Sequence, residues 1–249
     1  MDDARIPVAM IARAALLLRA YDEDAPVLTL RDLARRSGLP VSTAHRIAVA
    51  LADAGLLDRT GPGWAIGQGL WEIGELAPVS SQLRETALPH MMTLYEQTRE
   101  NVHLAVLEGT QALYVGRVTG TGSIPTLSRM GGRLPLHTTG VGKALLATQT
   151  EEWLTAYFRL PRQRETSYSI IDEGQLRADI DAARARGWAI ARQEMTLGNV
   201  SIAAALPAAE GRPATAIGVV AHLARTGEDQ LGRMVQRAAR AIGADLASH

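Results

Sequence analysis

Two short amphipathic segments joined by a turn constrain the fold of this chain more than any other feature of its sequence. The first opens with Thr29 and Asp32 in a capping-box arrangement, which satisfies free amides at a helix start, and it ends at Gly38. The second follows Pro40, a residue suited to a first helical turn, and ends near Gly55. Its apolar residues recur at helical spacing, at Ala44, Ile47, Ala48 and Leu51. The pattern predicts a helix-turn-helix.

A predicted β-hairpin follows the second of these helices. Two short extended runs, 56–60 and 64–67, flank the turn Gly61-Pro62-Gly63. With an amphipathic helix predicted over 8–20, this order of elements is typical of a winged helix-turn-helix domain. A further short helix ends near Pro78. We therefore expect three parts: a winged helix-turn-helix DNA-binding domain over 1–67, a linker helix over 68–79, and a second domain over 80–249.

The second part of the chain mixes helical and strand-like segments. A helix bent at Pro89 comes first. Strands are expected at 102–107, 112–118, 124–128, 188–193, 200–206 and 214–222, and helices at 140–148, 151–158, 173–186 and 228–246. Helices around a run of hairpins predict an α+β sandwich with a mainly antiparallel sheet. The length of 249 residues and an apolar content of 47% suit two folded units with sizeable cores.

Several function classes find no support in the sequence. The chain has no cysteine, which excludes disulfides and thiolate zinc sites, and its histidines lack metal-binding spacing, so we expect no metal and no cofactor. Residues 142–143 resemble a phosphate-binding loop, but His137 and Ala144 stand where glycine and Ser/Thr are required. No nucleophile elbow, apolar membrane span or secretory signal occurs, so we expect a non-enzymatic cytoplasmic protein. The formal charge of zero argues against nonspecific coating of nucleic acid.

Four stretches of the sequence resemble the IclR family of bacterial transcription regulators. Residues 37–46 (SGLPVSTAHR), continuing to 54–56 (AGL), are similar to that family's recognition-helix region, and 101–107 (NVHLAVL) to its first sensor strand. The most distinctive block is 133–146 (RLPLHTTGVGKALL), and 198–204 (GNVSIAA) resembles a late motif. The resemblance implies a winged domain that binds double-stranded operator DNA, and a GAF-like domain that binds a small-molecule effector. It also implies a homodimer or a dimer of dimers that acts as a repressor or activator.

The outward face of the second helix supplies the expected DNA contacts. If its apolar residues face the core, then Ser42, Thr43, Arg46 and Val49 point outward, and Arg46 can reach guanine bidentately. Arginines on the preceding helix and on the wing could hold phosphates, whereas His45 is expected to be partly packed. The alternative is an ordinary solvated polar face. The predicted DNA-binding residues are Arg31, Arg35, Arg36, Ser42, Thr43, His45, Arg46 and Arg59.

The glycine-bounded helix start at 140–143 is the expected centre of the effector site. Glycines allow close approach, and amides at a helix start favour an anion. Carried over from the family residue by residue, the effector-binding set is Leu134, Gly140, Val141, Ser201, Gly218 and Val220. Some relatives that bind very small oxoacids have serines where Gly218 and Val220 stand. We therefore expect a roomier pocket for an aromatic or medium-length organic acid. The alternative is that the glycines serve packing and Ser201 is a satisfied strand hydroxyl.

The sequence thus predicts a ligand-responsive transcription regulator. The competing hypothesis is a GAF-like metabolite-binding protein, or an enzyme, whose helix-turn-helix does not bind DNA. Specific, salt-dependent retardation of DNA by the protein distinguishes the two.

Overall fold

A computed structural model of the chain describes residues 5–77, 82–120, 122–225 and 227–248. The chain divides into two compact units, Met1–Ser81 and Gln82–His249, and the helix expected to link the domains is grouped with the first unit.

The first unit is a helical bundle with a small sheet. Its core contains Leu17, Leu33, Ala44, Leu57 and Trp64, all at most 5% exposed. The strand order is β1-β3-β2, with both pairs antiparallel. Its elements are α1 (Arg5–Leu18), β1 (Val27–Leu28), α2 (Leu30–Ser37), α3 (Val41–Asp53), β2 (Leu57–Thr60), β3 (Gly63–Ile66) and α4 (Gln68–Glu75).

The helix caps and the apolar spacing predicted from the sequence are present in this unit. Thr29 caps α2 by accepting a hydrogen bond from the Asp32 amide, and Gly38 ends the helix with a left-handed φ of 69°. Helix α3 buries the four predicted residues, Ala44, Ile47, Ala48 and Leu51. The predicted helix-turn-helix and hairpin are confirmed, while the two-residue strand β1 was not predicted.

The second unit is built on one six-stranded sheet. Its strand order is β6-β5-β4-β9-β8-β7, and every neighbouring pair is antiparallel. Its helices are α5 (Arg84–Thr98), α6 (Gly140–Ala147), α7 (Glu151–Phe158), α8 (Glu173–Arg186) and α9 (Glu228–Ala247), with a short 3₁₀ turn at Leu223–Arg225. Its strands are β4 (Asn101–Glu108), β5 (Gln111–Val118), β6 (Arg133–Pro135), β7 (Ala189–Arg192), β8 (Asn199–Ala205) and β9 (Thr215–His222).

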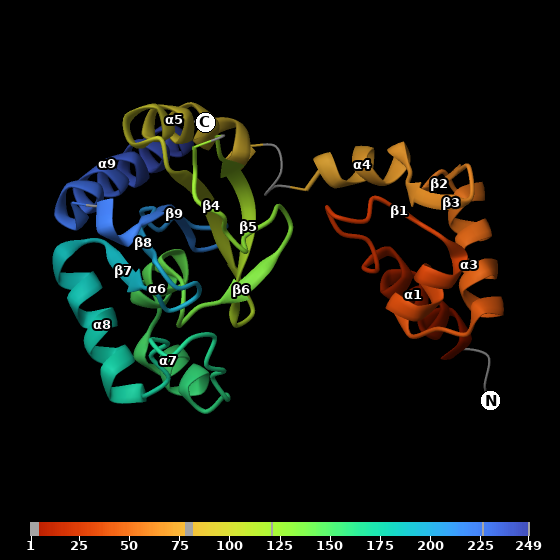
Figure 1. Cartoon of the computed structure of the whole chain (residues 1–249), viewed down its shortest axis with the longest axis horizontal. Coiled ribbons are helices and arrows are strands. Elements are labelled where there is room, and N and C mark those ends of the chain that lie inside the picture. The colour runs from red at the N-terminus through yellow and green to blue at the C-terminus, as the bar shows by residue number, and fades with distance from the viewer. Residues whose placement is uncertain (1–4, 78–81, 121, 226, 249) are drawn as a thin grey trace. The chain divides into compact units, whose positions relative to one another are not determined.

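Helices cover both faces of this sheet (Figure 1). Helices α5 and α9 pack together on one face, while α6 and α8 lie on the other. Because both faces are covered, β4 is buried over six consecutive residues instead of alternating. The predicted α+β architecture with an antiparallel sheet is therefore confirmed.

One predicted strand, 124–128, is wrong. The segment is irregular, and its backbone is held by side chains: the Asn101 amide donates to the Ile124 carbonyl, and the Asn199 amide to the Pro125 carbonyl. Pro125 has no N–H to give to a sheet ladder, which explains why a strand does not form there. The edge strand β6 comes later, at Arg133–Pro135, where no strand was predicted.

Candidate functional site

The exposed face of α3 presents the residues expected to read DNA. Ser42 and Arg46 are exposed and Thr43 is half-buried. His45 is exposed, so the expectation that it is partly packed is wrong. Val49 is half-buried against the core, which corrects its expected outward position. These positions give the first turns of α3 a polar outer face, as a recognition helix needs.

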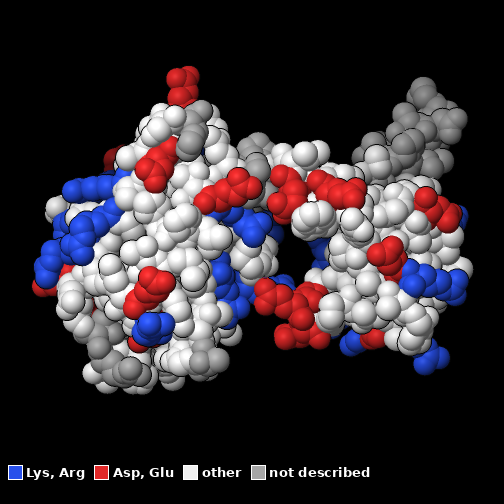
Figure 2. Space-filling view, turned by 90° about the horizontal axis from the view of Figure 1, so that it is seen from above, with Lys and Arg blue, Asp and Glu red and all other residues white. Residues whose placement is uncertain are grey.

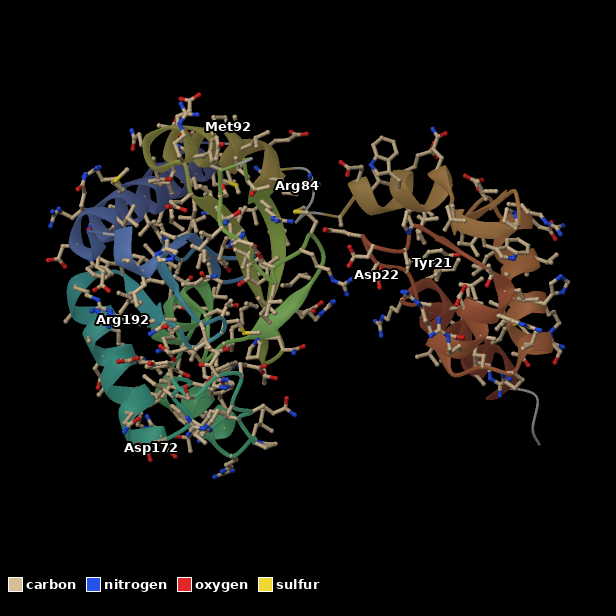
Figure 3. The ribbon with its side chains drawn as sticks, viewed as in Figure 1. Tyr21, Asp22, Arg84, Met92, Asp172 and Arg192 are labelled. Carbon is tan, nitrogen blue, oxygen red and sulfur yellow. The ribbon has the colours of Figure 1, made fainter. Side chains whose placement is uncertain are left out.

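The four other arginines of the predicted DNA-binding set differ in how exposed they are and in how many internal contacts they make. Arg31 is exposed on α2, and Arg35 is exposed while pairing with Asp32 at 2.6 Å. Arg36 pairs with Asp22 at 2.7 Å and also donates to the Ala20 carbonyl, so it ties α2 to the segment after α1, where Figure 3 labels Asp22. Arg59 lies 5.5 Å from the Trp64 ring on the hairpin. A phosphate contact by Arg36 would therefore compete with an internal contact.

The sequence carries as many acidic as basic residues, and its formal net charge is zero. Both kinds of side chain occur on the face that Figure 2 shows. Specific contacts from a few side chains, and not bulk attraction, must therefore provide any selectivity for nucleic acid.

A cavity opens in the second unit on the side of the sheet that faces α6. The empty space within it is about 410 Å³ when the open solvent at its mouth is included. Its walls come from the sheet, the start of α6, the β5–β6 loop (residues 119–132) and the β7–β8 loop (residues 193–198). The wall residues are His103, Tyr114, Thr126, Leu127, Ser128, Leu134, Thr138, Thr139, Ala191, Gln193, Glu194, Met195, Thr196, Asn199, Ser201 and Val220.

The structure brings part of the predicted effector set to this cavity. Leu134, Ser201 and Val220 line it. Gly140 and Val141 lie behind the wall: the Gly140 amide donates to the Ser201 hydroxyl at 3.2 Å, and Val141 is buried in the core. Gly218 also lies behind the wall, where a Cβ atom would come within 2.8 Å of the Ala203 Cβ. The extra room expected at Gly218 is therefore absent, because Ala203 and the α6 residue Val141 fill the space beside it.

The start of α6 is completed by hydroxyl groups. Thr139 accepts the Gly142 amide at 3.1 Å, and Ser201 accepts the Gly140 amide. Because the Ser201 oxygen serves as an acceptor, its proton can be donated to an occupant of the cavity. The positive end of the helix dipole lies behind this hydroxyl and favours negative charge in front of it.

His103 is a neutral wall residue. It is 1% exposed, its Nε2 lies 2.8 Å from the Ser128 hydroxyl, and its ring meets Tyr114 edge-on. Burial, assisted by the positive charge of Arg117, lowers the pKa of His103 to about 3. His103 lies on β4, which confirms the strand predicted at 102–107.

A buried ion pair behind the wall was not predicted. Lys143 on α6 is 1% exposed, and its Nζ lies 2.6 Å from both Glu194 Oε1 and Asp179 Oδ2. Burial raises the pKa of Glu194, and the charge of Lys143 opposes that shift. No local sequence pattern reveals these partners, because they lie 36 and 51 residues away along the chain. Within the described ranges, no group of three metal-ligating side chains occurs.

Two protein-family models match the chain. The model described as the IclR helix-turn-helix domain matches residues 10–61, and that described as the bacterial transcriptional regulator IclR C-terminal domain matches residues 77–244. None of the helices that the structure describes has the length and apolar character of a membrane span.

Known regulators are similar over nearly the whole chain. The transcriptional repressor IclR of Escherichia coli K12 is 29% identical over 243 residues, covering 94% of this chain and 89% of the relative. The Pca regulon regulatory protein of Pseudomonas putida is 28% identical, covering 89% and 77%. The crystal structure of an IclR homolog complexed with 4-hydroxybenzoate, from Microbacterium hydrocarbonoxydans, is 29% identical with a TM-score of 0.90, covering 96% of this chain and all of that one.

The pKa of His103 makes the stability of the protein depend on pH. Its usual value is 6.5 and the folded value is about 3, so below pH 6.5 the unfolded chain binds the proton more readily. Stability should therefore fall as the pH drops below about 6.5, by about 2 kcal/mol between pH 7 and pH 5 from this group. Urea unfolding of the wild type and of His103→Gln over this range measures the effect. The variant should show a flatter pH dependence, and parallel curves would contradict the assignment.

Proposed function

The chain belongs to the IclR family of bacterial transcriptional regulators, and on this premise we propose that it is a homodimeric operator-binding protein that senses a small aromatic or medium-length organic acid. The observation that carries the proposal is the cavity beside the start of α6, with the Ser201 hydroxyl as a donor in its wall. No catalytic step is proposed, since a histidine whose pKa is about 3 does not exchange protons near neutral pH. Because operator DNA lies in the bacterial cytoplasm, the proposal includes a cytoplasmic location.

We propose that α3 reads the major groove. Arg46 is its longest exposed donor and can donate two hydrogen bonds to the major-groove edge of guanine. Ser42, Thr43 and His45 lie beside it on the same helix. Arg31 is exposed on α2, and the side chain of Arg35 is 72% exposed although it pairs with Asp32, so both can meet phosphates, and Arg59 on the hairpin can approach the adjacent groove. Arg36 is the weakest member of the set because it is 32% exposed and is held by both Asp22 and the Ala20 carbonyl.

Helix α4 supports a dimer. None of its eight residues is buried: Trp71 and Ile73 are 60% and 59% exposed, and Leu76, directly after the helix, is 82% exposed. Ile73 and Leu76 lie on one side and Trp71 on the other. Large apolar side chains grouped at the surface in this way favour contact with a partner. A second copy of the chain is the proposed partner, because paired recognition helices would then meet two half-sites of an operator.

The cavity suits an acid held by neutral donors. Among the described wall residues, Glu194 is the charged one, so no arginine or lysine in the wall meets a carboxylate. The Ser201 hydroxyl, backed by the start of α6, is the proposed partner of the carboxylate, while Leu134 and Val220 cover an apolar body. The relative that holds 4-hydroxybenzoate supports an aromatic ligand.

Replacing Arg46 tests the reading of DNA. Arg46→Ala should weaken binding to a DNA site selected from a random pool by about 1–3 kcal/mol, and relax the base preference at one position of each half-site. Arg240→Ala removes an exposed arginine of α9 in the other unit and serves as the charge-matched control. Fluorescence anisotropy at fixed salt measures both. Unchanged affinity in folded Arg46→Ala would remove this residue from the recognition surface.

Replacing Ser201 tests the effector site. Ser201→Ala should weaken the best acid from a panel of aromatic and aliphatic acids by about 0.5–1.5 kcal/mol, and by up to about 3 kcal/mol if the hydroxyl meets a carboxylate. Calorimetry on the full chain measures this loss. Thr155→Ala deletes a hydroxyl on the surface of α7 and should leave the affinity unchanged. Equal affinities for Ser201→Ala and the wild type would place the acid elsewhere.

Replacing apolar residues of α4 tests the dimer. Ile73→Glu with Leu76→Glu puts two like charges into the proposed interface and should shift the protein to monomers in analytical ultracentrifugation. Operator affinity should fall with it, because one half-site no longer assists the other. Leu160→Glu, at an exposed leucine of the second unit, is the control. A double variant that stays dimeric would assign the interface to another surface.

A further inference from the structure

The most deeply buried charge of the second unit stands outside the cavity wall. Lys143 is 1% exposed, and Glu194, its partner at 2.6 Å, has a side chain that is 5% exposed. Its other partner, Asp179 on α8, is 35% exposed and has access to water. Lys143 does not line the cavity, whereas Glu194 does. The lysine therefore connects α6 to the β7–β8 loop through one carboxylate and to α8 through the other.

The β7–β8 loop forms one wall of the cavity in an unfavourable backbone conformation. Gln193, Glu194, Met195 and Thr196 all line the cavity, and Gln193 has a φ of 59°. A non-glycine residue adopts this left-handed conformation only when its surroundings impose it. Thr166 donates to the Gln193 carbonyl at 2.7 Å, and the Gln193 side chain accepts the Gly198 amide at 3.0 Å.

Glu194 is the point at which this loop is tied to the core. Its carboxylate accepts from Lys143 and, at 3.3 Å, from the Arg192 amide, while its backbone carbonyl accepts from Ser169 at 2.7 Å. Arg192, labelled in Figure 3 at the end of β7, forms a bidentate ion pair with Glu228 at the start of α9. The ion pair with Glu228 thus fixes Arg192, the residue from which the loop leaves the sheet.

Glu194 needs the positive charge of Lys143 to stay ionised inside the protein, whereas Asp179 does not. An ionised Glu194 without a neighbouring positive charge would be too costly to keep inside, so it would take up a proton or move to water. Since its neighbours on both sides are wall residues, such a movement would displace the wall. Asp179 is on a helix and already reaches solvent, so its contact with Lys143 holds no part of the cavity.

We propose that Lys143 is a positioning residue for the effector: by neutralising Glu194 it holds the β7–β8 loop as a cavity wall, and so sets effector affinity without touching the effector. The inference rests on the proposed function, because it takes this cavity as the effector site.

Amide hydrogen exchange on the full, ligand-free chain tests the positioning directly. Lys143→Gln should speed exchange in residues 193–199 by about tenfold or more, while amides of β4 serve as the internal reference for global opening. Asp179→Asn removes the other carboxylate at the same 2.6 Å distance and should change the loop by less than about twofold. The double variant Lys143→Gln/Glu194→Gln replaces the ion pair with a neutral amide pair and should restore slow exchange. Equal effects of Lys143→Gln and Asp179→Asn, or no effect in the loop, would overturn the proposal.

Calorimetry with 4-hydroxybenzoate and the same acid panel adds a readout that a purely structural role would not move. Affinity should fall about tenfold in Lys143→Gln, stay within about threefold in Asp179→Asn, and recover in the double variant. Wild-type affinity in Lys143→Gln would overturn the proposal. A wild-type protein that binds no acid refutes the proposed ligand class instead, and the exchange measurement then decides the role of Lys143 alone.

Discussion

The close approach of α6 to the central sheet is the constraint on which the second unit depends. Where α6 begins, a Cβ on Gly140 would lie 2.7 Å from the Ser201 carbonyl oxygen, and one on Gly142 would lie 2.3 Å from the Leu136 oxygen. Residues 140–146 are all buried, so the amides of the first turn cannot rely on water and need protein acceptors. Thr139 and Ser201 provide two of these acceptors. The requirement that buries the helix therefore also places a hydroxyl proton at the cavity.

Charge is arranged around this contact so that no positively charged side chain lies among the described wall residues of the cavity. The ammonium group of Lys143 lies behind the wall and is matched by two carboxylates, while His103 is kept uncharged by burial. A carboxylate entering such a cavity meets oriented hydroxyls and a helix start in place of a formal ion pair. Oriented dipoles of this kind need no reorganisation when the ligand arrives, so recognition depends on geometry more than on net charge.

Sequence reasoning succeeded where the signals are local. Thr29, Gly38 and the spacing of the apolar residues of α3 define the helix-turn-helix within a few turns of chain. It failed at 124–128, where strand propensity was overridden by side chains from β4 and β8. It also missed the partners of Lys143, which are 36 and 51 residues away along the chain. For Gly218, the sequence could show that a side chain is absent but not that Ala203 and Val141 already fill the space.

The cavity wall contains two kinds of residue: those fixed in place by the sheet, and those on loops that can vary without changing the fold. Seven wall residues lie on strands, and their positions follow from the sheet register: His103, Tyr114, Leu134, Ala191, Asn199, Ser201 and Val220. Seven others come from the β5–β6 and β7–β8 loops, whose backbones are held by side-chain hydrogen bonds and an ion pair and not by a sheet ladder. Substitutions in these loops can change the shape and polarity of the cavity without disturbing the contact between α6 and the sheet. A ligand-responsive regulator built this way can keep its fold while its effector changes, so the identity of the effector is to be sought in the chemistry of the two loops.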